Sequence, residues 1–351
     1  MLRKDHAFSV SAGVVSIAIS IFLTFGFAAR GNAAEKTWEL KMHHHAGAYI
    51  TKNALGGWAK NVEDATKGRV KIKILPFTAL GGVTEGYDLV TSGTADVAWT
   101  FTGFFPGQFA LSDIMTLPFV TCPSSELTSG VLWDLTEKFP QEFGKEYSEV
   151  KLLTIHTSDP NIVGTTSKPV RKLEDLKGLN MRVSAGLTDF VKALGANPQM
   201  VPTGDTYLAF EKGVLNGFIS DWPAVDAFKW YDVINYYTTI GINSNAYWII
   251  MNKKVWNSMP EDVQKQVMSV SGRTGATFIG KVWDEYSKSI VTQVAKMPKK
   301  ELIQLPGEEV ARWRKLAEPM WESYVSKLEA KGSPGKKVLE YALQRVSECS
   351  K

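Results

Sequence analysis

Arg182 is the side chain in this sequence whose type and position most clearly suggest chemistry. It lies in Leu179–Val183 (L-N-M-R-V), a short apolar pattern that predicts a central strand. A buried arginine needs an anionic partner, and its planar guanidinium can hold a carboxylate through two parallel hydrogen bonds. The residues alone leave two interpretations open: an arginine that binds an anionic ligand, or one that forms an internal salt bridge or faces water from an edge strand.

Three consecutive histidines, His43, His44 and His45, are a second candidate. Neutral imidazoles bind metal ions, but alternate side chains of a strand point to opposite faces, and no cysteine or carboxylate cluster stands nearby. We therefore expect no metal site, and instead expect one histidine at the end of the first strand to donate a hydrogen bond.

Large aromatic side chains form a third group. Ligand sites are mostly apolar with a few polar anchors, although aromatic residues at this density more often belong to a core. No G-x-S-x-G, P-loop, G-x-G-x-x-G after a strand, or H-E-x-x-H motif accompanies them, so the sequence predicts no catalytic residues. The aromatic candidates are Trp99, Phe101, Phe104, Phe105, Trp222 and Trp248.

The elements that would position these residues follow an α/β order. Alternating strands are predicted at 38–43 and 70–75, a buried strand at 96–99, and helices at 47–67 and 83–92. Further strands at 150–155, 180–183 and 217–219 alternate with short helices that end at glycine. Ligands in open α/β sheets lie at the carboxyl ends of strands, so residues 99–102, which include Thr102, and Ser220–Trp222 should face one cleft from opposite sides.

The last third of the chain is predicted to be helical. Pro260 and two acids begin a long apolar stripe that continues to about Val294, and further helices are expected at 308–330 and 335–347.

Composition and the N-terminus limit the class of protein. The chain has 351 residues and a net charge of only +4, too little for a nucleic-acid-binding protein. Arg3 and Lys4, an uncharged stretch from Ala7 to Ala29, and small residues before Glu35 predict a cleaved signal peptide at 1–34; an uncleaved membrane anchor is the alternative. Cys122 and Cys349, the two cysteines, could pair after export, but nothing in the sequence places them together.

Several motifs together resemble the solute-binding proteins of tripartite ATP-independent periplasmic (TRAP) transporters, the DctP-like family. In family order, they span nearly all of the chain after the signal peptide. They are G-T-A-D-V-A at 93–98, L-P-F at 117–119, L-E-D-L-K-G-L-N-M-R-V at 173–183, L-G-A-N-P at 194–198, the stretch 207–217, and M-P-E-D-V-Q at 259–264.

The resemblance implies a periplasmic-binding-protein-like α/β fold, in which two α/β lobes surround a ligand cleft and a long helix crosses both. The first lobe would comprise residues 35–158 and about 246–288, and the second 159–245 and about 289–351. It also implies that Arg182 clamps a ligand carboxylate, and that His45, Phe101 with its neighbours, and Ser220-Asp221-Trp222 contact the ligand.

One departure from the family pattern narrows the expected ligand. Many members carry a second arginine before the stretch that reads Thr165-Thr166-Ser167 here, but this chain has no cation in residues 158–163, where Asn161 is a candidate contact. We therefore expect a ligand with one acidic group, a carboxylate or a sulfonate. No cofactor is expected, although Asp221 could hold a hydroxyl, an ammonium, or a cation that bridges to the ligand.

The preferred hypothesis is therefore a monomeric periplasmic receptor that delivers an organic acid anion to TRAP permease subunits in the membrane. The alternatives are a receptor for a neutral or cationic solute of an ATP-driven importer, and an exported hydrolase with an Asp/His pair.

Overall fold

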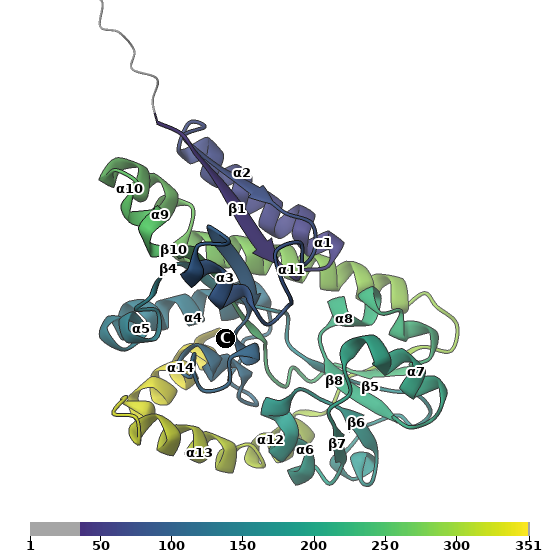
Figure 1. The fold of residues 1–351 in the computed structure, drawn as a ribbon. Helices are drawn as coiled ribbons and strands as arrows, with labels where there is room; N and C mark the ends of the chain where they lie inside the picture. The colour runs from purple at the N-terminus through teal and green to yellow at the C-terminus, as the bar shows by residue number, and fades with distance from the viewer. Residues whose placement is uncertain (1–35, 350–351) are drawn as a thin grey trace, which may run out of the picture. The chain divides into compact units, whose positions relative to one another are not determined.

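The computed structural model describes residues 36–349, and the chain from Thr37 onward forms one unit. The predicted signal peptide lies outside the described residues. Two mixed sheets organise this unit, each covered by helices, which confirms the predicted two-lobed α/β class (Figure 1). Within residues 36–349, no helix is long and apolar enough to cross a membrane.

The first sheet has the order β2 (Val70–Ile74), β1 (Trp38–His44), β3 (Val97–Phe101), β10 (Ala246–Asn252) and β4 (Val150–Thr157). β1 runs parallel to β2 and β3, whereas β10 enters from far along the chain and pairs antiparallel with β3 and β4. The carboxyl ends of β1 and β3 therefore lie next to the amino end of β10. His45, Phe101 and Tyr247 come from these three ends.

The second sheet has the order β11 (Glu301–Ile303), β9 (Tyr236–Thr238), β5 (Ile162–Thr165), β8 (Gly217–Ser220), β6 (Asn180–Arg182) and β7 (Asn197–Gln199). β6 runs parallel to β7 and β8, so Arg182 and Ser220, the last residues of β6 and β8, stand at the carboxyl ends of neighbouring strands. Met181 packs into the core on one face, and alternation along the strand places Arg182 on the opposite face.

Helices cover both faces of each sheet. Around the first sheet are α1 (Ala48–Ile50), α2 (Gly56–Ala65), α3 (Gly86–Ser92), α4 (Ser125–Lys138), α5 (Pro140–Glu146), α9 (Lys253–Asn257) and α10 (Glu261–Ser269), with a π-helical stretch at Thr51–Leu55 joining α1 to α2. The second sheet carries α6 (Thr188–Ala193), α7 (Thr206–Glu211), α8 (Trp222–Ala227) and α12 (Gly307–Lys315).

α11 (Gly272–Val294) is the long helix that crosses both lobes. Its Ile279 and Val282 pack in a core of the first sheet, and its Ile290 and Val294 pack in a core of the second. The 23 residues of α11 span about 35 Å, enough to reach both cores. The sequence predicted one long apolar helical stretch from Pro260 to about Val294. In the structure, Val270 and Ser271 divide this stretch into α10 and α11.

The connections between the two sheets lie side by side. The chain leaves β4 through residues 158–161 and returns to β10 through residues 239–245. The Asn161 amide N–H donates to the Asn243 carbonyl at 2.7 Å, and the Ser158 N–H donates to the Asn245 carbonyl at 2.8 Å. A hinge between the lobes would have to bend at this paired segment.

The C-terminal helices also pass from one lobe to the other. Trp313 of α12 and the following Ala317 pack in the core of the second sheet. α13 (Glu318–Glu329) leads to α14 (Gly335–Cys349), whose Val338 and Ala342 pack in the core of the first sheet. The lobe limits expected from the sequence remain a prediction.

Candidate functional site

An aromatic cluster lies where β1, β3 and β10 meet the region between the sheets. The rings of Trp99 and Tyr247 stack with centroids 4.7 Å apart at an interplanar angle of 4°, and His156 stacks on Tyr247 at 5.5 Å. Trp99 Nε1 also donates a hydrogen bond to His156 Nε2 at 2.8 Å. The aromatic cluster consists of His45, Trp99, Phe101, Phe104, His156, Tyr247 and Trp283.

His45 belongs to this cluster as a neutral ring. Its Nε2 accepts the Phe101 backbone N–H at 3.2 Å, and its ring lies 4.8 Å from Trp99. Burial lowers the pKa of His45 to about 4, so the imidazole is uncharged at neutral pH. With Nε2 accepting, the proton is on Nδ1, which could donate to a ligand.

Of the other two histidines, His44 supports the local fold. His44 hydrogen-bonds the Leu75 carbonyl through Nε2 at 2.9 Å and accepts the Ala46 N–H on Nδ1 at 3.1 Å. Burial lowers the pKa of both His43 and His44. Across the residues that the structure covers, no group of three or more histidine, cysteine, aspartate or glutamate side chains could hold a metal ion.

Arg182 faces the region between the sheets from the carboxyl end of β6. Its Nη2 donates to the Thr203 hydroxyl at 2.8 Å, and its guanidinium carbon lies 5.8 Å from the centroid of the Trp230 ring. Burial lowers the pKa of Arg182, and the charge of Asp221 opposes this shift. The Nε of Arg182 donates to the Val201 carbonyl at 3.4 Å. Within residues 36–349, no carboxylate lies within ion-pair distance of Arg182, so Nη1 is free for an anion.

Asp221 follows β8 and is the N-cap of α8. Its Oδ1 accepts the Ala224 N–H at 3.0 Å, while its Oδ2 makes only a long contact of 3.4 Å with Asn245 Nδ2. Burial raises the pKa of Asp221, although Arg182 lowers it. Asp221 is thus a buried carboxyl close to, but not paired with, the guanidinium.

Asp159 is a second buried carboxyl beside Asp221. It lies in the connection after β4, and its Oδ2 accepts the Trp222 N–H at 3.3 Å. Burial, and next the charge of Asp221, raises the pKa of Asp159 well above its usual range. Burial raises the pKa of the Tyr247 phenol, and the charges of Asp221 and Asp159 raise it further, since Tyr247 stands near both acids.

The remaining candidates occupy different surroundings. Ser220 ends β8 and is 7% exposed, while the Trp222 ring stacks on Tyr237 at 5.0 Å. Asn161 is buried in the connection, where its Nδ2 donates to Asn243 Oδ1 at 2.8 Å.

Thr102 and Trp248 support the first lobe. The Thr102 hydroxyl donates to Asp113 Oδ1 and to the Ala246 carbonyl, directly after the strand that carries Phe101. Trp248 is fully buried among Phe105 and Phe109 in the core on the opposite face of β10 from Tyr247. Tyr247, rather than Trp248, therefore joins the aromatic cluster.

Sequence reasoning missed Tyr247, His156 and Asp159. Every residue of β10 is buried, so its pattern gives no alternation from which to choose between Tyr247 and Trp248. Asp159 lies in the segment noted above for its lack of a cation. Nothing in the sequence indicates that it approaches Asp221, which lies 62 positions further along the chain.

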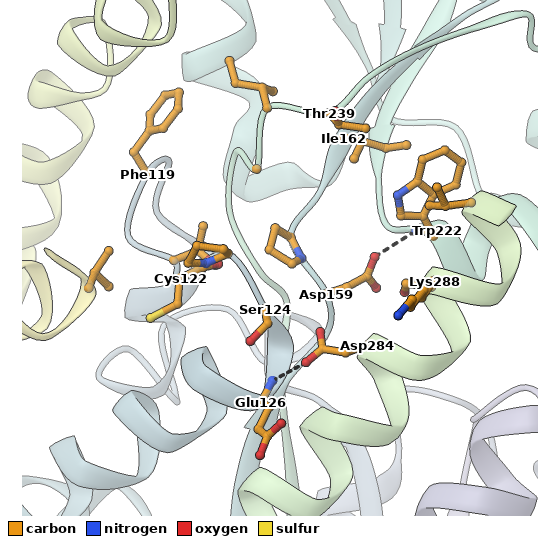
Figure 2. A pocket seen from close by; sticks show the side chains of 18 of the residues that line it. Phe119, Cys122, Ser124, Glu126, Asp159, Ile162, Trp222, Thr239, Asp284 and Lys288 are labelled. Atoms are coloured by element: carbon orange, nitrogen blue, oxygen red, sulfur yellow. Dashed lines mark hydrogen bonds between the residues drawn. The ribbon is translucent and has the colours of Figure 1, made fainter. Parts of the chain in front are cut away.

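A separate pocket of about 720 Å³ lies beside the connections between the lobes (Figure 2). Asp159 and Trp222 line it, together with Asp284 of α11, whose carboxylate accepts the N–H groups of Ser125 and Glu126 at the start of α4. Arg182 and the aromatic cluster do not line this pocket. The pocket and the candidate site therefore meet only at Asp159 and Trp222.

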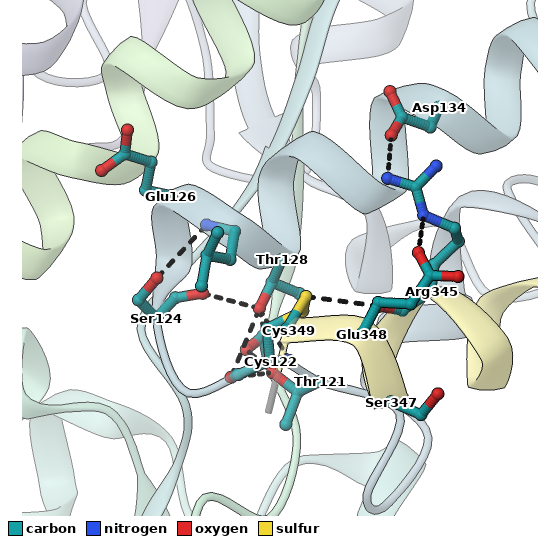
Figure 3. Close-up of a disulfide and its surroundings, with 12 residues drawn as sticks. Thr121, Cys122, Ser124, Glu126, Thr128, Asp134, Arg345, Ser347, Glu348 and Cys349 are labelled. Atoms are coloured by element: carbon teal, nitrogen blue, oxygen red, sulfur yellow. Dashed lines mark hydrogen bonds and ion pairs between the residues drawn. A yellow bond between two sulfur atoms is a disulfide. The ribbon is translucent and has the colours of Figure 1, made fainter. Parts of the chain in front are cut away.

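Cys122 borders the same pocket and forms a disulfide with Cys349 (Figure 3). The bond joins residues 227 positions apart, with Cα atoms 5.6 Å from each other, and fixes the end of α14 beside α4. The sequence left this pairing open. Near Cys122, Phe119 adopts a left-handed φ of 61° and packs in the core of the second sheet, so this loop also touches both lobes.

In the described residues, two lobes joined by paired connections and a long shared helix border a region faced by Arg182 and the aromatic cluster, an arrangement typical of solute-binding proteins. The family model for bacterial extracellular solute-binding proteins, family 7 (DctP), matches residues 42–328. The chain belongs to this family, whose members are receptors rather than enzymes, and the resemblance seen in the sequence is confirmed.

Solved structures and a curated relative agree with this assignment. A TRAP periplasmic solute-binding protein from Desulfovibrio salexigens, solved as an open complex, is 30% identical with a TM-score of 0.82, covering 90% of this chain and 97% of its own. A TRAP protein from Bordetella bronchiseptica with bound (R)- and (S)-mandelate is 26% identical with a TM-score of 0.78, covering 89% and 99%. The sialic acid-binding periplasmic protein of Vibrio cholerae is 22% identical, covering 90% and 95%.

Proposed function

We propose that this chain, after removal of residues 1–34, binds an organic acid with one anionic group in the periplasm and delivers it to TRAP permease subunits. The observation that carries the proposal is the guanidinium of Arg182, which is partly buried between the sheets without a carboxylate partner among the described residues. Desolvating a cation is costly unless an anion compensates it, so the site is completed by the acid group of a ligand.

The aromatic cluster favours a ligand with an apolar or aromatic body. Trp99, Phe101 and Tyr247 present rings from the first lobe, while Arg182 belongs to the second. In this proposal a flat ring packs on this cluster while its acid group binds the guanidinium. The (R)- and (S)-mandelate bound by the Bordetella relative has both features, a phenyl ring and one carboxylate.

Binding would bring the lobes together. The charged anchor and the aromatic surface lie on different sheets, so a ligand that contacts both favours the closed arrangement. In this proposal the lobes divide as expected from the sequence, and the paired connections at 158–161 and 239–245 bend as the hinge.

A thermal-shift screen of the mature protein against a library of organic acids tests the proposal. Monocarboxylates with aromatic or apolar bodies should raise the melting temperature, because a ligand that binds only the folded protein stabilises it by mass action. Sulfonate analogues should also be included. A screen in which only neutral or cationic solutes raise the melting temperature would contradict the proposal and favour an ATP-driven import system.

A further inference from the structure

The guanidinium of Arg182 is held on one side by a short segment of its own lobe. This segment, residues 201–203, follows β7, the strand that runs beside β6 in the second sheet. The Nε of Arg182 donates to the Val201 carbonyl at 3.4 Å, and its Nη2 donates to the Thr203 hydroxyl at 2.8 Å. Because the guanidinium is planar and its donors form a fixed fork, these two bonds together fix its orientation.

The 201–203 segment has supports of its own. The ring of Pro202 sets its φ, which is −52°, and the Pro202 carbonyl accepts the Asp205 N–H at 3.0 Å and the Thr206 hydroxyl at 3.0 Å. These bonds link the segment to the start of α7 through groups other than Arg182. The two acceptors for the guanidinium are therefore held in place independently of the guanidinium itself.

The Trp230 ring supplies a further contact. The guanidinium carbon of Arg182 lies 5.8 Å from the centroid of this ring, within the range of a cation–π interaction. Trp230 is fully buried and packs against Phe210 and Phe218, so the ring is itself fixed. The protein thus engages Nε and Nη2, whereas Nη1 donates to no acceptor among residues 36–349.

From this geometry we propose that Thr203 is a positioning residue for the anionic group of the ligand. Its hydroxyl holds the Arg182 guanidinium in place, so that Nη1 is presented to the acid group before the ligand arrives. A long arginine side chain that is free to rotate loses rotamer freedom when it binds an anion, and this loss lowers affinity. The bond to Thr203 removes part of that loss in advance. The inference rests on the proposed function and names the residue that prepares its anion site.

Thr203→Val and Thr203→Ser test the inference. Valine has the shape of threonine without the hydroxyl group, whereas serine keeps the hydroxyl group without the methyl group. In calorimetric titration with (R)- and (S)-mandelate, Thr203→Val should weaken the affinity of the better enantiomer by about 3- to 10-fold, and Thr203→Ser should stay within about 2-fold of wild type. Equal melting temperatures without ligand would show that both variants fold.

Thr166→Val is the matched control. Thr166 is another half-buried threonine of the same lobe, and its hydroxyl donates to the Asn216 carbonyl at 3.3 Å. Thr166 directly follows β5, which β8 separates from β6. The control therefore removes a threonine hydroxyl from the second lobe without touching Arg182, and it should bind mandelate as wild type does.

The guanidinium can also be observed without any ligand. In nitrogen–proton correlation spectra, the Nε–H signal of Arg182 can be identified by its absence in Arg182→Lys. Hydrogen bonding protects such a proton from exchange with water. Exchange of this proton should therefore be faster in Thr203→Val than in wild type, and Thr203→Ser and Thr166→Val should resemble wild type.

The outcomes separate the inference from the proposed function. If Thr203→Val binds mandelate as wild type does, or if Thr203→Ser loses as much affinity as Thr203→Val, the inference is overturned and the proposed function stands. If affinity falls in Thr203→Val while Nε–H exchange is unchanged, Thr203 does not act through Arg182, and the inference is again overturned.

Failure of wild-type protein to bind mandelate would count against the proposed aromatic acid receptor. The exchange measurement then decides the inference by itself. Faster exchange of the Arg182 Nε–H in Thr203→Val supports the positioning role, and unchanged exchange overturns it.

Discussion

Breaking the disulfide between Cys122 and Cys349 should destabilise the protein substantially. The bond closes a loop of 227 residues and anchors the last turn of α14. For a loop of this length, the loss of chain entropy in the unfolded state corresponds to about 5 kcal/mol of stability. With an unfolding entropy of about 2.1 cal/mol/K per residue over roughly 300 residues, the melting temperature should fall by about 8 °C.

Differential scanning calorimetry can measure this change in the mature protein and in Cys122→Ala, Cys349→Ala and the double variant. Because each substitution breaks the same bond, the single and double variants should have similar melting temperatures. A reductant should lower the melting temperature of wild-type protein and leave that of the double variant unchanged. Two free thiols in reduced wild-type protein, found by thiol titration, together with a melting temperature equal to that of the oxidised form would show that the disulfide does not stabilise the protein.

Three further predictions concern titration, closure and the core. Burial raises the pKa of Asp113 to about 6 and of Glu146 to about 7, above their unfolded values near 4, so these two carboxyl groups make the free energy of unfolding fall as pH rises from about 4 to 7, while buried histidines with a lowered pKa act in the opposite direction. Glu146→Gln removes one of the two contributions, so in urea titrations the free energy of unfolding of the variant minus that of wild type should rise with pH across this window; a constant or falling difference would contradict it. Small-angle scattering should give a smaller radius of gyration with saturating ligand than without, and equal values would argue against lobe closure. Trp248→Phe should lower the melting temperature but change ligand affinity less than 3-fold, since Trp248 is fully buried in the core, and a larger loss of affinity would place it in the site.

The sequence was informative where local pattern decides structure. Alternating residues at 38–43 and 70–75 predicted β1 and β2, and the M-P-E-D-V-Q start predicted the helical stretch that includes α10. Arg182 stood out because a cation in an apolar strand is unusual. These features depend on residues within a few positions of each other.

The remaining features depend on contacts between distant residues. The pairing of Cys122 with Cys349 and the approach of Asp159 to Asp221 arise only when the lobes assemble. Phe119 reaches the core of the second sheet from a loop of the first lobe, which no local pattern indicates. A strand buried on both faces, such as β10, likewise hides which side chain lies on the face of the aromatic cluster.

Calorimetric titration of Arg182→Lys and Arg182→Ala with the tightest acid from the screen tests whether the Arg182 guanidinium binds the acid group of the ligand. Lysine keeps the charge but lacks the planar pair of donors, so both variants should lose affinity, by about 2–5 kcal/mol or roughly 30- to 5000-fold for alanine. Arg171→Lys is the matched control, because Arg171 is exposed and pairs with Glu301 on the surface of the same lobe. We expect native affinity in Arg171→Lys and large losses in both Arg182 variants with folding intact. Near-native affinity in folded Arg182→Ala would contradict the proposed role of Arg182 and place the anion site elsewhere.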